Sequence, residues 1–168
     1  KMPEVLHWFK WEAYFTWISG FSLMIIIYYW GAETYLIDRE VLDLSKLQAI
    51  GISVSSFIVS WIVYDRVCKA PLGKNDITLS IIVFLLILLA AYGFTNVYSG
   101  RGAFVHVGAM VGTIMVANVF LVIIPNQRIV VKALIKGEEP DAYLGVEGKQ
   151  RSTHNNYLTL PVLLMMIS

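Results

Sequence analysis

The sequence predicts an all-α fold: a polytopic bundle of transmembrane helices with four full spans and the beginning of a fifth. Four long apolar runs support this prediction, at residues 13–30, 47–64, 77–98 and 103–124. Each has about 18 to 22 residues, enough to cross a hydrocarbon layer roughly 30 Å thick at the helical rise per residue. Composition agrees, because 57% of residues are hydrophobic and 15% are charged, against roughly 25% charged in soluble domains.

We expect both ends of this sequence to be internal positions of a longer chain. Residues 1–12 mix charged and aromatic side chains and carry no secretory signal. The first span follows at residues 13–30. A fifth apolar run begins near Tyr157 and reaches Ser168 after about a dozen residues, too few to span a bilayer. We therefore expect residues 1–168 to be part of one integral membrane domain, with flanking helices outside this sequence.

Between the second and third spans, residues 65–76 form a basic loop, and a longer basic segment follows the fourth span at residues 125–155. The first half of this longer segment is expected to extend the preceding helix, which Gly137 and Pro140 end. The segment between the first and second spans, residues 31–46, mixes acids with Leu and Ile and predicts a short interfacial helix. Ten basic residues lie on the side of the N-terminal end and the two basic loops, and three lie on the other side, at Arg39, Lys46 and Arg101. Because Lys and Arg collect in cytoplasmic loops, the N-terminal end of this sequence is predicted to be cytoplasmic.

Several classes of protein are excluded by simple counts. No run of Lys and Arg with interleaved aromatic residues occurs, so nucleic-acid binding is not expected. The single cysteine, Cys68, provides neither an internal disulfide nor a CxxCH haem-attachment motif nor a zinc cluster. No metal site is predicted.

Polar residues at membrane depth are the candidates for function, because an ionisable group there costs about 2.5 to 3.5 kcal/mol on insertion scales. His106 lies near the start of the fourth span with Gly102, Gly108 and Gly112 on neighbouring turns. Small neighbours let a flat ligand such as haem approach the backbone, with the imidazole as axial ligand. Alternatively, Gly108 and Gly112 form a GxxxG motif that only packs helices.

Two further groups lie at or near the spans. Asn118 is interpreted first as an interhelical hydrogen-bonding residue. His154, Asn155 and Asn156 crowd donors and acceptors at the predicted cytoplasmic mouth of the fifth helix, either as a ligand entrance or as an N-terminal cap of that helix. We expect His106 and His154 to lie toward opposite membrane faces.

Charged residues at helix ends have a simpler explanation. Lys10, Glu12, Asp65 and Arg66 flank the first two spans, where they can extend to the interface or form ion pairs without any function. His7 could lie beneath the same mouth as His154. The sequence alone does not distinguish this arrangement from a surface position.

Three segments together resemble one family: residues 6–21 (LHWFKWEAYFTWISGF), 100–128 (GRGAFVHVGAMVGTIMVANVFLVIIPNQR) and 151–168 (RSTHNNYLTLPVLLMMIS). They are similar to the N-terminal membrane region of bacterial membrane-bound urate oxidases, with shorter support from YLID and WIVYDRVCKAPLG. The resemblance implies oxidation of urate toward 5-hydroxyisourate in purine catabolism, in the bacterial inner membrane. It also implies further helices and a C-terminal cytochrome c domain, whose haem c passes electrons to the respiratory chain.

The matching segments carry the candidate site residues. We expect catalytic roles for His154, Asn155, Asn156 and Glu12, cofactor binding by His106 and Arg101, and substrate binding by His7, Arg128 and Asn118. The expected partners are the lipid bilayer, urate, and a cytochrome c domain or the respiratory chain, and an intramembrane haem is a further candidate cofactor. The alternative function is a non-catalytic membrane anchor or small-molecule transport module that docks a cytochrome.

Overall fold

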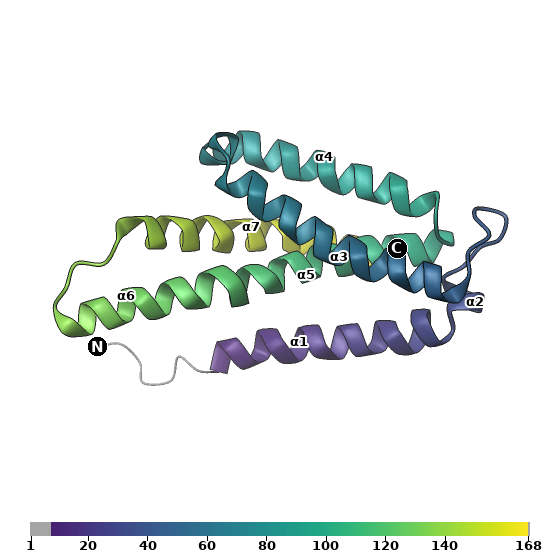
Figure 1. Ribbon diagram of the computed structural model, residues 1–168, viewed down its shortest axis with the longest axis horizontal. Helices are drawn as coiled ribbons and strands as arrows, with labels where there is room; N and C mark the ends of the chain where they lie inside the picture. Colours follow the sequence, from purple (N-terminus) through teal and green to yellow (C-terminus); the bar gives the residue numbers. More distant parts are fainter. Residues whose placement is uncertain (1–7, 168) are drawn as a thin grey trace.

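The computed structural model describes residues 8–167, and the side chains of residues 11–73 and 75–167. This part of the chain is helical and contains no strand (Figure 1). The helices in chain order are α1 (Trp8–Met24), the π-helix η1 (Ile25–Trp30), α2 (Ala32–Tyr35), α3 (Lys46–Lys69), the 3₁₀ turn η2 (Pro71–Lys74), α4 (Asp76–Thr95), α5 (Gly100–Ala117), the π-helix η3 (Asn118–Ile123), α6 (Ile124–Lys136) and α7 (Ala142–Ile167).

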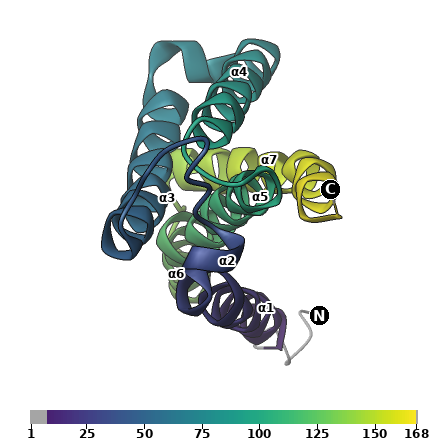
Figure 2. The same cartoon turned by 90° about the vertical axis from the view of Figure 1, so that its right-hand side faces the viewer.

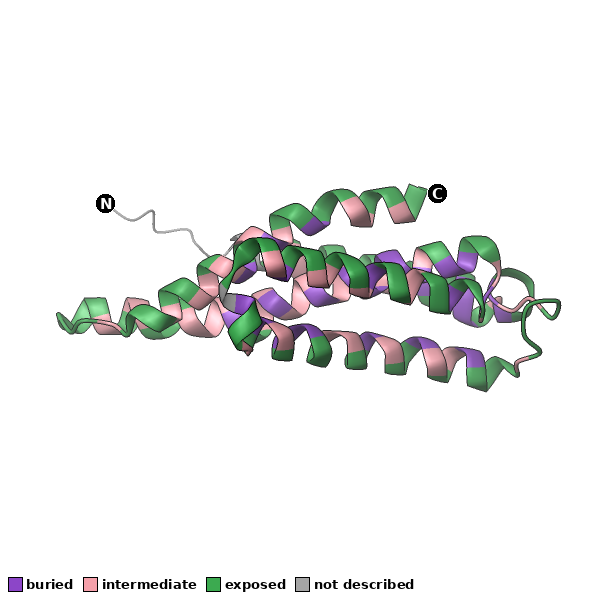
Figure 3. Cartoon of the chain, turned by 90° about the horizontal axis from the view of Figure 1, so that it is seen from above, coloured by how far each residue is buried: buried purple, intermediate pink, exposed green. Residues whose placement is uncertain are grey.

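Four helical stretches of the described chain are long and apolar enough to cross a membrane, which confirms the predicted fold class. They are Trp11–Trp30, Lys46–Lys69, Asp76–Thr95 and Gly100–Lys136. Much of the surface of these helices is exposed (Figure 3). Many of the exposed side chains are apolar, as Phe15, Ile58 and Leu89 illustrate. Such a surface suits contact with lipid and would be unfavourable in water.

Successive long helices reverse direction, so their ends gather at two poles of the bundle (Figure 1). We call the pole where α3 ends and α4 and α7 begin the α6 pole, and the opposite one, beside α2, the α2 pole. An end-on view places α5 in the middle, and it contacts α1, α3, α4 and α7 (Figure 2). This position explains why α5 contributes eight buried residues.

Side-chain caps fix where these helices begin. Ser45 and Gln48 form a capping box at the start of α3, Asn75 accepts bonds from the backbone N–H groups of Ile77 and Thr78, and Ser99 accepts one from Gly102. Such caps satisfy N–H groups that have no partner within the helix. Three spans therefore start at residues whose side chains specify the start.

The segment before α3 differs from the predicted interfacial helix, since only Ala32–Tyr35 is helical. The chain instead folds over the start of α5. Ser99 donates its N–H to the Leu36 carbonyl at 2.9 Å and its hydroxyl to the Tyr35 carbonyl at 2.7 Å. Gly102 allows this approach, because a Cβ there would lie 3.1 Å from the Tyr35 carbonyl oxygen.

Helix α6 extends to Lys136 and ends at Gly137, which confirms the predicted extension of the fourth span. The second half of residues 125–155 was predicted to be a loop, and this is wrong, because α7 already begins at Ala142. Gly137, with φ 73°, ends α6 in the left-handed conformation. Asp141 Oδ1 then accepts a bond from the Tyr143 N–H at 2.9 Å at the start of α7. His154 and its neighbours therefore lie inside a helix, and their interpretation as its N-terminal cap is also wrong.

Candidate functional site

A buried hydrogen-bond network joins α3, η3 and α7 between the apolar faces of the bundle. Tyr64 Oη lies 2.8 Å from His154 Nδ1, and Asn118 Nδ2 donates to Tyr64 Oη at 3.2 Å. Asn118 Nδ2 also donates to Asn155 Oδ1 at 3.1 Å, and Asn155 Nδ2 donates to the Met115 carbonyl at 2.9 Å. We call Tyr64, Asn118, His154 and Asn155 the Tyr64 network.

Helical spacing brings these side chains together. Arg151, His154, Asn155 and Leu158 follow one another on α7 at intervals that place them on one face. On the facing span, Asn118 is the first residue of the π-helix η3. Short π-helical segments are frequent at functional sites, because the extra residue per turn redirects side chains.

The bonding pattern suits one tautomer of His154. Asn118 donates to the Tyr64 oxygen, so the Tyr64 hydroxyl can donate to His154 Nδ1, and in that tautomer the imidazole proton sits on Nε2. Burial lowers the pKa of His154, and the positive charge of Arg151 lowers it further. Both effects favour the neutral imidazole, and the negative charge of Asp76 opposes them. Its buried Nε2 has no hydrogen-bond partner in the described chain, and neither has Asn118 Oδ1.

An ion group lies next to this network, toward the α6 pole. Arg151 Nη2 donates to Asp65 Oδ1 at 2.7 Å, and Lys69 Nζ donates to Asp65 Oδ2 at 2.8 Å. The Arg151 guanidinium also lies 5.1 Å from the centroid of the Tyr64 ring. Arg151 is 0% exposed, yet its Nε and Nη1 have no partner among the described residues.

A cavity of about 500 Å³ opens beside the ion group, and we call it the Arg151 cavity. The end of α3, η2, the start of α4 and the first half of α7 form its walls. Its volume falls within the roughly 300 to 1,000 Å³ of small-molecule sites. The charged residues in its lining are Lys69, Asp76, Glu147, Lys149 and Arg151.

The structure brings three of the predicted site residues together: Asn118, His154 and Asn155. Asn118 bonds to both α3 and α7, which confirms its interhelical hydrogen bonding. Four other predicted residues lie outside the network and are exposed: Glu12, Arg101, Arg128 and Asn156. His7 lies outside the described residues.

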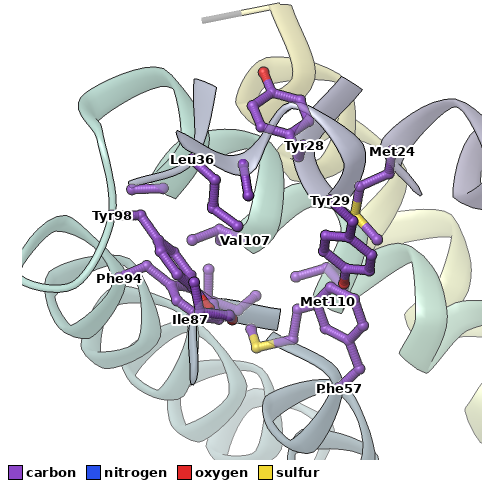
Figure 4. Close-up of a cluster of buried hydrophobic side chains, with 14 of the residues drawn as sticks. Met24, Tyr28, Tyr29, Leu36, Phe57, Ile87, Phe94, Tyr98, Val107 and Met110 are labelled. Carbon is purple, nitrogen blue, oxygen red and sulfur yellow. The ribbon is translucent and has the colours of Figure 1, made fainter. Parts of the chain in front are cut away.

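His106 belongs to a separate cluster within the bundle core. The imidazole is 0% exposed, and its Nδ1 lies 2.7 Å from the Gly102 carbonyl oxygen. Five aromatic rings have centroids 4.9 to 6.2 Å from the imidazole centroid. Figure 4 shows these rings among the buried side chains of the core; they belong to Tyr28, Tyr29, Phe57, Phe94 and Tyr98.

These surroundings do not fit a haem. His106 Nε2 is buried without a partner, as an axial ligand would be, but the five rings occupy the space around it that a porphyrin needs. Haem binding by His106 therefore stays a prediction that requires these rings to move. The sequence of this chain has one cysteine, Cys68, so a haem c attached through a CxxCH motif has no place here. Within the described residues, no group of three potential metal ligands occurs.

Sequence reasoning missed the roles of Tyr64, Asp65 and Arg151. The sequence pattern places Asp65 at a helix end as an interfacial charge, and Arg151 in a basic loop. The spacing of Arg151, His154, Asn155 and Leu158 was the available signal, but it is meaningful only on a helix that starts well before Tyr157.

Comparison with known families identifies the chain's relatives. The family model described as urate oxidase N-terminal matches residues 1–168. Searches of curated proteins and of solved structures gave no significant match. The family match covers the whole chain, including every residue of the Tyr64 network and the Arg151 cavity.

Proposed function

The chain belongs to the urate oxidase N-terminal family, and from this premise we propose that it is the membrane domain of a urate-oxidising oxidoreductase. In the proposed reaction, urate gains the oxygen atom of one water molecule to give 5-hydroxyisourate, and two protons and two electrons are released. The electrons pass to a cytochrome c domain, on a segment outside this sequence, and on to the respiratory chain. A haem c there would accept one electron at a time.

The observation that carries this proposal is the Tyr64 network. Urate is a planar anion with carbonyl oxygens and ring N–H groups. His154 Nε2 offers a donor and Asn118 Oδ1 an acceptor, and both are buried without a partner in the described chain. Because an unpaired buried polar group costs about 1 to 3 kcal/mol, a ligand that pairs with them is favoured.

The residues of this chain would bind, orient and exchange protons. Asn118 and Tyr64 fix the imidazole of His154, so that its Nε2 proton has one orientation. A neutral imidazole can donate to a urate carbonyl and later accept a proton released by the reaction. Asn155 fixes Asn118 in turn through its 3.1 Å bond.

The exposed candidates are placed at the periphery of the proposed site. Glu12 and Asn156 would line the approach, and Arg101 and Arg128 would contact parts of the full protein outside this sequence, as would His7. The proposed orientation puts the α6 pole in the cytoplasm of a bacterial inner membrane. Urate would then arrive from the cytoplasm, where purines are degraded, and electrons would leave on the other side.

The test uses the full-length protein in membranes. Urate added without oxygen should reduce the c-type haem, as followed by its absorbance. His154→Ala should lower this turnover at least tenfold with parental haem content, because it removes the central donor of the network. His106→Ala, by the predicted role of His106, should instead lower haem content or electron transfer.

Leu160→Ala is the matched control, since Leu160 is an exposed residue of α7 outside the network, 75% exposed. It should leave turnover unchanged. A folded, haem-loaded protein that urate does not reduce would contradict the proposal and favour the alternative function, a non-catalytic anchor or transport module.

A further inference from the structure

We propose that the Arg151 cavity is the binding pocket for the oxopurine anion, and that Arg151 anchors the anion there. This inference rests on the proposed function and deepens it by naming the site and its main ligand-binding residue. It differs from the sequence prediction, which assigned no role to Arg151.

The first observation is the unsatisfied hydrogen-bonding capacity of Arg151. Its side chain is 0% exposed and lines the cavity. Only Nη2 has a partner, Asp65 Oδ1 at 2.7 Å, so the Nε–H and both Nη1–H groups are left without one in the described chain. Three buried charged donors on one residue are costly unless an acceptor reaches them, and an anionic carbonyl compound supplies acceptors.

The second observation is that the ion group retains a positive charge. Asp65 bonds to Arg151 with one oxygen and to Lys69 with the other. One carboxylate therefore neutralises only one of two cations. This positive charge is local to the Arg151 side of the cavity, because Lys149, Asp76 and Glu147 elsewhere in the lining together carry one negative charge. An anion would therefore be attracted to the Arg151 side.

The remaining lining matches a ligand with both donors and acceptors. Lys149 adds a further basic side chain, while Asp76 and Glu147 are acidic. Carboxylates can accept from the ring N–H groups of an oxopurine, and Lys69 can donate to its carbonyl oxygens. Inorganic phosphate or a lipid phosphate at neutral pH offers few or no donors for the two carboxylates. The mixed lining therefore favours the oxopurine.

The cavity and the Tyr64 network are adjacent but share no residue: Arg151 lines the cavity and contacts the Tyr64 ring. Arg151 lies one helical turn from His154 on α7, and its guanidinium lies against the Tyr64 ring. Cys68, one turn beyond Tyr64 on α3, also lines the cavity. A ligand anchored at Arg151 would thus lie next to the Tyr64 network, one helical turn of α7 from His154.

The test measures equilibrium binding of radiolabelled urate to the full-length protein in detergent, together with urate-dependent haem reduction. Removing Arg151 alone would leave Asp65 with only one cation, so the main variant is the double substitution Arg151→Gln with Asp65→Asn, which removes both charges. It should keep a parental unfolding temperature and weaken urate binding at least tenfold. Lys132→Gln is the matched control, because Lys132 is an exposed basic residue of α6 outside the cavity lining.

A second variant guards against misfolding of the first. Thr153→Val removes one hydroxyl from the cavity lining without a charge change and should weaken urate binding by a factor of about two to five. Arg151→Lys retains the charge and should recover part of the affinity lost in the double variant. Parental urate affinity in folded Arg151 variants, or in Thr153→Val where these do not fold, would overturn the inference.

Two competition experiments distinguish other anions. Inorganic phosphate, or vesicles containing phosphatidylglycerol, should not displace urate at equal concentration. Displacement by either would overturn the oxopurine assignment in favour of a phosphate site. Failure of the inference is separable from failure of the proposed function: parental urate oxidation by the folded double variant contradicts only the pocket, whereas no urate oxidation by the parental protein contradicts the function.

Discussion

At the scale of single residues, Tyr64 is the side chain on which the buried network depends. Its hydroxyl bonds to His154 at 2.8 Å and to Asn118 at 3.2 Å, and its ring supports the guanidinium of Arg151. It is 2% exposed, so water does not readily replace a lost bond. The Tyr64 side chain therefore links α3, η3 and α7.

Tyr64→Phe should destabilise the protein by about 1 to 3 kcal/mol, because it leaves His154 Nδ1 and one Asn118 N–H without a buried partner. The measurement is the shift of the thermal unfolding midpoint in detergent. Tyr92→Phe removes the same hydroxyl from an α4 residue that is 70% exposed, and it should shift the midpoint little. Equal shifts in the two variants would mean that the Tyr64 bonds contribute nothing to stability.

The sequence was informative about residues whose chemistry is rare in an apolar helix. Asn118, His154 and Asn155 could be identified because few polar side chains occur near the spans. Asp65 and Arg151 could not, since charges at predicted helix ends usually reach water. Their burial depends on packing between α3 and α7, which no local pattern in the sequence encodes.

At the scale of elements, the contact between α5 and α7 determines where the network residues meet. Gly108 makes this contact close: a Cβ there would lie 3.0 Å from Met166 Cγ and 3.6 Å from the Val162 carbonyl oxygen. Gly112, one turn further along α5, has open space around a Cβ. The two glycines of the GxxxG motif are therefore not equivalent.

Gly108→Leu should push α7 away from α5 and lower stability by about 1 to 3 kcal/mol, the usual cost of overpacking. Gly112→Leu is the matched control and should have a much smaller effect. Thermal unfolding and limited proteolysis between α6 and α7 would report both changes. If the two variants behave alike, the close approach at Gly108 does not hold α7 in place.

Spans were easier to predict than the segments between them. Each long apolar run became a helix, because only a helix satisfies its backbone groups in lipid. Residues 142–156 are polar and were expected to form a loop, yet they are the first half of α7. Asn126 Nδ2 bonds to Glu147 Oε2 at 2.8 Å and stabilises this helix against α6, a tertiary contact between residues 21 positions apart.

At the scale of the whole molecule, the two poles differ in charge. The α6 pole holds the ion group, the Arg151 cavity and the basic end of α6, whereas the segment at the α2 pole carries Glu33, Asp38, Glu40 and Asp43. The reversal of direction at each connection, visible in Figure 1, makes this asymmetry a property of the entire bundle. The orientation of the bundle in the membrane therefore determines the side from which a ligand reaches the Arg151 cavity.

The final prediction is that the α6 pole faces the cytoplasm, because basic residues concentrate there. Cysteines introduced singly by Glu40→Cys and Glu138→Cys, in a background without free cysteines such as Cys68, test this with a membrane-impermeant maleimide on intact cells. Both positions are exposed and lie at opposite poles. Position 40 should be labelled in intact cells, and position 138 only after permeabilisation. The reverse pattern would place the Arg151 cavity on the outer side, and a cytoplasmic supply of urate would then be excluded.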